Sequence, residues 1–125
     1  MNQNSWTQQL SYLIQISLRN PRRRRFYLAN FTLLNQEEQE ALARILWDLF
    51  QLQVNEAIQE KKEEMIIDLA LNPEATYNSA EWNKIDEQIE RQLIARALAT
   101  NEEQEINKAY EALKALGAAL NATGG

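Results

Sequence analysis

Apolar residues recur along most of this chain at intervals of three and four, the spacing of helices that bury one side. The repeat starts anew near residues 5, 21, 36, 79 and 101, and only two prolines and three glycines occur among 125 residues. Because a chain so poor in turn formers favours helices, we predict an all-α, single-domain bundle of about five helices with one long central helix. The bundle is predicted to span residues 1–120, with residues 121–125 as a flexible C-terminal tail.

Capping residues mark the predicted helix boundaries. Asn20 is suited to cap a helix that begins with Pro21. Asn35 followed by Glu38 has the form of a capping box, and Asn72-Pro73 predicts the end of the same long helix. Two further boxes are predicted, at Asn78–Glu81 and at Thr100–Glu103.

The charged run at residues 60–64 interrupts the apolar stripe of the long helix. We expect a solvated turn of one continuous helix there, with a bend or break as the alternative. Trp47 lies at the edge of its stripe, which makes it a candidate anchor for an interface. The helix that begins at Pro21 carries Phe26, Ala29 and Leu33 on one side. Further apolar residues widen that surface, namely Tyr27, Leu28, Phe31 and Leu34.

The chain has no cysteine and no histidine. It therefore lacks disulfides, thiolate chemistry, and the commonest general base and nitrogen ligand for metals. Acidic triplets such as Glu37, Glu38 and Glu40 have the chemistry for Mg²⁺, but they also suit the first turn of a helix, which we favour. We predict no catalytic residues, no metal, no cofactor and no small-molecule substrate, and therefore no enzyme.

No apolar run approaches the ~18 residues that a membrane span requires. The first residues, Met1 to Asn4, also lack the basic and long apolar regions of a secretory signal. We expect a cytoplasmic protein with no membrane partner.

Charge is distributed very unevenly along the chain. The net charge is −5, from 18 acidic and 13 basic residues. Residues 1–36 contain five arginines and no acidic residue, whereas every Asp and Glu lies in residues 37–125. The five arginines are Arg19, Arg22, Arg23, Arg24 and Arg25. Segregation of this kind indicates an anionic partner.

Residues 22–25 fall in the first turn of the predicted helix, where the helix dipole disfavours each exposed cation by about 0.3–1 kcal/mol. An anion removes this conflict, because free backbone N–H groups at a helix start and guanidinium groups together form a phosphate site. Phe26, Tyr27 and Phe31 follow, and they are either core residues or platforms on which unpaired bases stack. Tyr27 joins the five arginines in the predicted site.

Three kinds of anionic partner fit the arginines. We favour a nucleic-acid backbone, either RNA or single-stranded DNA. An acidic protein surface is the second reading, and it includes the acidic helices of this chain or of a neighbouring copy. An anionic membrane or a sorting signal fits least, because the arginines are not spread along a basic amphipathic face.

An all-helical chain of this size with one surface of Arg19, Arg22, Arg23, Arg24 and Arg25 resembles the small helical subunit of CRISPR effector complexes. The resemblance implies several copies along guide and target strands, in contact with phosphates and with other subunits. This chain differs from that pattern in being acidic overall. We therefore expect a non-catalytic accessory subunit that binds a phosphate backbone, with a protein-interaction adaptor as the alternative.

Overall fold

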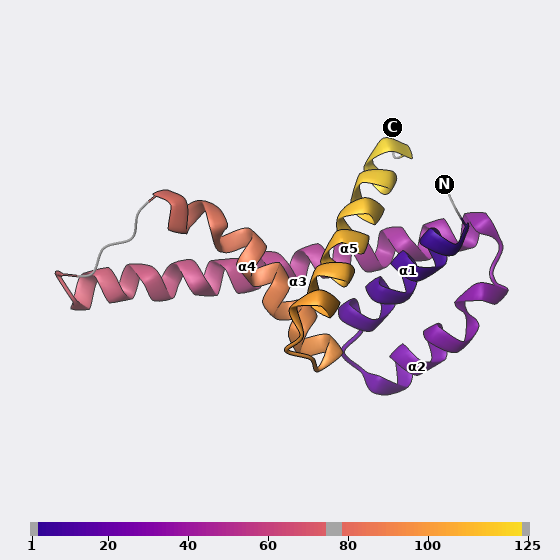
Figure 1. Ribbon diagram of the computed structural model, residues 1–125, viewed down its shortest axis with the longest axis horizontal. Coiled ribbons are helices and arrows are strands. Elements are labelled where there is room, and N and C mark those ends of the chain that lie inside the picture. Colours follow the sequence, from indigo (N-terminus) through magenta and orange to yellow (C-terminus); the bar gives the residue numbers. More distant parts are fainter. Residues whose placement is uncertain (1–2, 75–78, 124–125) are drawn as a thin grey trace.

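The computed structural model describes residues 3–74 and 79–123. They form an all-α bundle of five α-helices, of which α3 is the long central one (Figure 1). In chain order the elements are α1 (Gln3–Ser17), α2 (Pro21–Asn30), the 3-10 helix η1 (Phe31–Leu33), α3 (Gln36–Leu71), α4 (Ser79–Leu98) and α5 (Glu103–Thr123).

The long helix α3 begins and ends where the sequence predicts. Asn35 Oδ1 accepts from the Glu38 N–H at 2.8 Å, and the Asn35 N–H donates to Glu38 Oε1 at 2.9 Å, which completes the capping box. At the other end the Asn72 N–H donates to the Asp68 carbonyl at 2.8 Å. The helix is continuous through residues 60–64, so the charged run is a solvated turn and not a break.

Three boundaries differ from the prediction. Helix α2 ends at Asn30, whose side-chain amide donates to the Phe26 carbonyl at 2.7 Å, and the chain tightens into η1 instead of continuing to Leu34. Thr100 Oγ1 accepts from the Glu102 N–H and not from Glu103, so the predicted capping box is a turn before α5. Helix α5 continues to Thr123, beyond the predicted start of the tail. The predicted cap Asn78 and the last two tail residues lie outside the described residues.

Helix α1 is the hub of the bundle, because it packs against α2, α3, α4 and α5. Leu10, Leu13 and Ile14 are fully buried, and the Ser17 hydroxyl, also buried, donates to the Leu13 carbonyl at 2.6 Å. At the start of the helix Trp6 Nε1 donates to Gln39 Oε1 of α3 at 2.8 Å. No charged residue occurs from Gln3 to Leu18, as expected for a helix buried on several sides.

Helix α2, unlike α1, faces the core with one side only, and apolar side chains lie on both its inner and its outer face. Tyr27 and Leu28 pack against the core, and Phe31 of η1 is buried. Phe26, Ala29 and Leu33 face solvent, with Phe26 61% and Leu33 80% exposed. Helix α2 itself contains no buried residue. Its packing against α1 therefore rests on a few partly buried side chains, and one apolar stripe remains outside.

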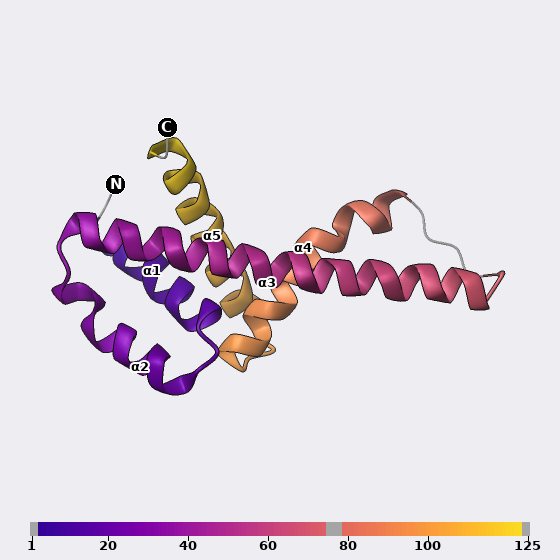
Figure 2. The same ribbon diagram turned by 180° about the vertical axis from the view of Figure 1, so that it is seen from behind.

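The end of α3 and the start of α4 project away from the other helices, at the opposite end of the molecule from α2 (Figures 1 and 2). Met65 is buried within this projection. We call residues 56–71 of α3 the arm. Its exposed apolar side chains include Ile66, Ile67 and Leu71, each more than half exposed.

Trp47 of α3 is partly buried and packs against the backbone of α5 at Gly117. A Cβ atom at Gly117 would lie 2.5 Å from Trp47 Cζ2 and 2.6 Å from Trp47 Cη2, closer than side-chain carbons approach. The ring also packs on Phe50, with centroids 5.9 Å apart. Trp47, a candidate interface anchor from its position in the sequence, therefore packs on α5 and on Phe50 of its own chain and is only partly exposed.

We expect Gly117→Ala to destabilise the fold by about 1–3 kcal/mol, because the new methyl group overlaps the Trp47 ring. Urea unfolding followed by circular dichroism measures the change. In a Trp47→Phe background the six-membered ring of the indole is gone, so the same Gly117→Ala change should be much less costly. It should even stabilise α5, by up to about 1 kcal/mol of helix propensity. An equal cost in both backgrounds would contradict the packing described.

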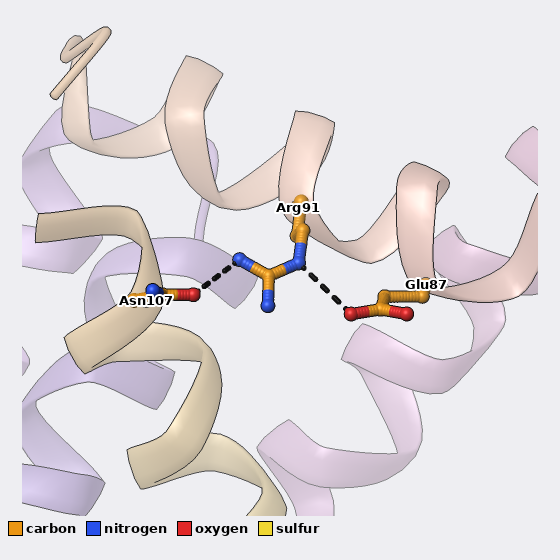
Figure 3. Close-up of polar contacts among 3 residues, drawn as sticks. All are labelled: Glu87, Arg91 and Asn107. Atoms are coloured by element: carbon orange, nitrogen blue, oxygen red, sulfur yellow. Dashed lines mark hydrogen bonds and ion pairs between the residues drawn. The ribbon is translucent and has the colours of Figure 1, made fainter. Parts of the chain in front are cut away.

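Helices α4 and α5 are joined by Arg91. Its Nε donates to Glu87 Oε1 at 3.2 Å and its Nη1 donates to Asn107 Oδ1 at 2.6 Å (Figure 3). The guanidinium carbon also lies 4.3 Å from the centroid of the Tyr110 ring. Arg91 thus connects α4 to α5 through the amide of Asn107 and the aromatic face of Tyr110, while its charge-assisted bond to Glu87 is made within α4.

Glu90 lies one residue before Arg91, partly buried. Burial raises the pKa of its carboxyl, the negative charge of Asp86 raises that pKa further, and Lys114 opposes the shift. Because the folded protein holds this proton more tightly than the unfolded chain does, the stabilisation is full at low pH. It is lost as the pH rises through the raised pKa.

Glu90→Gln should therefore raise the thermal midpoint at pH 7 and have little effect near pH 3.5. Thermal unfolding followed by circular dichroism at both values tests this, with the exposed Glu111→Gln as the control for a simple loss of charge. A midpoint that falls at pH 7 would contradict it.

Candidate anion-binding site

The start of α2 is capped by the protein itself. Asn20 Oδ1 accepts from the Arg22 N–H at 2.9 Å and from the Arg23 N–H at 3.2 Å. The Arg24 N–H donates to the Asn20 carbonyl at 3.0 Å, and Pro21 has no N–H. Asn20 is thus the predicted N-cap. The expectation of free backbone N–H groups for an anion is wrong, because this cap uses them, so any anion must be held by side chains.

The five arginines have no carboxylate partner within the described part of the chain, where no acidic oxygen lies within 4.0 Å of their guanidinium groups. Arg19, Arg22, Arg23 and Arg25 are exposed, and Arg24 is partly buried. The reading in which the cluster pairs with its own acidic helices is therefore not what the fold shows. Five guanidinium groups in and beside one helix turn remain available to an external anion.

Four of the five arginines line one of two hollows, and Arg25 lines neither of them. Arg19 and Arg24 line a cleft of about 490 Å³ between the end of α1, the start of α2, α3 and the end of α4, together with Arg96. The polar side chains of Gln15 and Gln53 lie in the same wall. The remaining lining residues are apolar: Ile16, Leu18, Leu93, Ala97 and Ala99. Three cations and two amides thus line one cleft that has no acidic residue in its wall.

Arg96 belongs to this site but is absent from the predicted one. In the sequence it is a single basic residue in the last turn of a helix, where any cation suits the helix dipole. Only the packing of both α2 and α4 against α1 brings it to the same cleft as Arg24. Gln53 of α3 also fixes the position of this corner, because its Nε2 donates to the Ser17 carbonyl at 2.9 Å.

The second hollow, about 420 Å³, is shallow and is lined by Arg22, Arg23, Phe26 and Tyr27. Phe26 and Tyr27 form an edge-to-face pair with ring centroids 5.5 Å apart. Of the three aromatic residues considered as base platforms, Phe31 is buried and unavailable, and Tyr27 is partly buried. Phe26, which the predicted site omits, is the exposed one.

A third hollow, about 600 Å³, runs between α1 and η1 and continues the cleft. Its lining is uncharged: Thr7, Gln8, Ser11, Tyr12, Gln15, Phe31 and Thr32. Gln15 lines this hollow and the arginine cleft alike. Hydroxyl and amide groups thus follow directly from the arginines, and none of the three hollows has an acidic residue in its lining.

One wall of the arginine cleft is a strained turn. Ala99 has φ = 51°, in the left-handed region that favours glycine. The Thr100 N–H donates to the Ala95 carbonyl at 3.1 Å and the Ala99 N–H to the Arg96 carbonyl at 3.3 Å, which is the pattern of a helix end closed by a left-handed residue.

Ala99→Gly should stabilise the protein by about 0.5–1 kcal/mol. The glycine removes about 1–2 kcal/mol of steric cost that alanine has in the left-handed region. Part of this gain is lost, because glycine gives the unfolded chain more conformational entropy. Chemical denaturation measures the change, with Ala41→Gly on the exposed side of α3 as the matched control. The control should destabilise by about 1 kcal/mol, and a loss of stability in both variants would contradict the assigned backbone conformation.

The described residues meet the requirements neither of a metal site nor of a membrane span. No three Asp or Glu side chains there are close enough to hold a metal ion together, and Glu38, of the acidic triplet named above, serves as a cap. None of the helices in the described part of the chain has the length and apolar character of a membrane span.

Comparison of the chain with protein-family models, with curated proteins and with solved structures found no match.

Proposed function

We propose that this chain is a non-catalytic subunit that binds the phosphate backbone of a nucleic acid, RNA or single-stranded DNA, through its arginines. The observation that carries the proposal is the cleft in which Arg19, Arg24 and Arg96 lie without a carboxylate. Guanidinium groups bind phosphate oxygens in pairs and resist deprotonation, which suits a row of phosphates better than a single weak anion.

The uncharged groove beside the cleft supports the same proposal. A strand that leaves the arginines along α1 meets Gln15, Ser11 and Thr7, which donate and accept hydrogen bonds without repelling phosphates. On the outer side of α2, exposed Phe26 between Arg22 and Arg23 offers a base a face on which to stack. These contacts are made to backbone and base faces, so binding without sequence preference is proposed.

Assembly with other protein subunits, as in CRISPR effector complexes, is part of the proposal and rests on the resemblance alone. The acidic remainder of the chain would limit the contact with nucleic acid to the basic end, since phosphates are repelled elsewhere.

Fluorescence anisotropy with labelled single-stranded RNA and DNA across a salt series tests the proposal. If three or four phosphates are neutralised, log K should fall with log salt with a slope of about −3. Arg24→Gln together with Arg96→Gln should weaken binding at least about tenfold and bring the slope about 1.5 units closer to zero. Changing residues 22–25 to Gln should reduce the slope further.

Lys84→Gln together with Lys108→Gln is the matched control, because both lysines are exposed and lie outside the hollows described. The control should retain the affinity and nearly all of the slope. No binding at about 50 mM salt with ~100 μM protein, or equal losses in the control and in the cleft variant, would contradict the proposal. Retained affinity for an acidic peptide under those conditions would favour the adaptor instead.

A further inference from the structure

Two exposed helical stripes, at opposite ends of the molecule, have matching patterns. The outer stripe of α2 and η1 begins with Arg22, Phe26 and Ala29, whose intervals of four and three place them on one face of α2. Leu33 follows in the 3-10 helix η1. All four are exposed, and the flanking Arg23 and Arg25 are exposed as well. A basic first turn is thus followed by an apolar second half that nothing in the described chain covers.

The arm presents the complementary stripe. Its outer face consists of Glu56, Glu60, Glu63, Ile67 and Leu71, at intervals of four, three, four and four. Every one of these residues is exposed, Ile67 by 56% and Leu71 by 80%, and Ile66 beside them by 58%. Here the acidic residues come first and the apolar ones second.

In both stripes the charged residues come before the apolar residues along the chain. If the two helices lie side by side in the same direction, the arginines meet the glutamates, and Phe26 and Leu33 meet Ile67 and Leu71. At 1.5 Å per residue the outer stripe of α2 and η1 extends over about 16 Å and the arm stripe over about 22 Å, so the arm is long enough to cover the whole of the first stripe. Such a pairing buries apolar side chains on both helices. It also places a row of carboxylates beside exposed arginines that have no carboxylate partner within the described chain.

One molecule cannot make this contact within itself. Helix α2 packs against α1 at one end of the molecule, and the arm projects at the other end (Figures 1 and 2). Pairing of two arms is disfavoured, because residues 56–74 contain six acidic and two basic residues. The chain's own basic stripe is therefore the partner with both the charge and the apolar pattern.

We propose that the outer stripe of α2 in one copy docks on the arm of a second copy. The two surfaces differ, so each copy keeps one free stripe, and association continues beyond a dimer to a ring or an open chain. This contact leaves the cleft of the proposed function free, because Arg19, Arg24 and Arg96 line that cleft on another side of α2. It covers Phe26, so in an associated copy this ring no longer offers a base a face on which to stack.

The test is a charge exchange between the two stripes, measured by sedimentation velocity on protein freed of nucleic acid, at about 50 mM salt. The unmodified chain should grow in mass beyond a dimer as its concentration rises toward ~100 μM, and about 500 mM salt should reverse this. The arm variant (Glu56, Glu60 and Glu63 to Arg) and the α2 variant (Arg22, Arg23 and Arg25 to Glu) should each remain monomeric.

An equal mixture of the two variants should associate again, because each reversed stripe then meets its opposite charge on the other variant. The control changes three other exposed acids, Asp48, Glu105 and Glu111, to Arg and should associate like the unmodified chain. Circular dichroism first establishes that all variants are folded. A monomer at every concentration, a dimer that both variants retain, or a mixture that stays monomeric would overturn the proposal.

The two proposals fail separately. The arm variant should bind single-stranded RNA at least as well as the unmodified chain at concentrations where both are monomeric. The cleft variant with Arg24→Gln and Arg96→Gln should lose RNA binding but still associate. If the cleft variant loses association as well, the stripes described are not the contact.

Discussion

The burial of α1 on several sides is the constraint on which the other helices depend. Leu10, Leu13 and Ile14 have no exposed surface, and α1 contacts every other helix. A charged side chain on such a helix would lose its hydration without a partner, which explains why residues 3–18 are uncharged. The absence of acidic residues from about half of residues 1–36 is therefore explained by the burial of α1. The arginines that follow do not, because they stand on a helix without buried residues.

Helix α2 tolerates an electrostatically unfavourable first turn because its side chains are not confined in the core. Four arginines in the first turn oppose the helix dipole and one another, but their guanidinium groups reach solvent or the cleft, and the Asn20 cap satisfies the backbone. The helix is held by Tyr27, Leu28 and Phe31 on its inner side. Such a helix contributes little to the core, so substitutions of its outer and cleft-facing residues should cost little stability.

The two ends of the molecule carry opposite charges, so they offer surfaces to different kinds of partner. The basic end has hollows without acidic residues, and the arm presents acidic and apolar residues that the rest of the described chain leaves uncovered. The cleft and the outer stripe use different arginines on different sides of α2. In the two proposals, a phosphate backbone in the cleft and a second copy on the outer stripe could therefore be bound at the same time. A row of copies would bring several clefts together, where avidity adds to a modest single affinity.

The sequence by itself determined the elements that depend on neighbouring residues. Asn20, the Asn35–Glu38 box and Asn72 set helix boundaries through hydrogen bonds that span two to four residues. The favoured expectation of one continuous helix through residues 60–64 is confirmed as well, although the charged run interrupts the apolar stripe there. The arginines of the candidate site were evident from charge alone. The tertiary structure decided which side of α2 faces the core, that Arg96 shares a cleft with Arg24, and that Gly117 accommodates Trp47. These depend on how helices distant in the sequence pack against one another, and periodicity within a single helix carries no record of its neighbour.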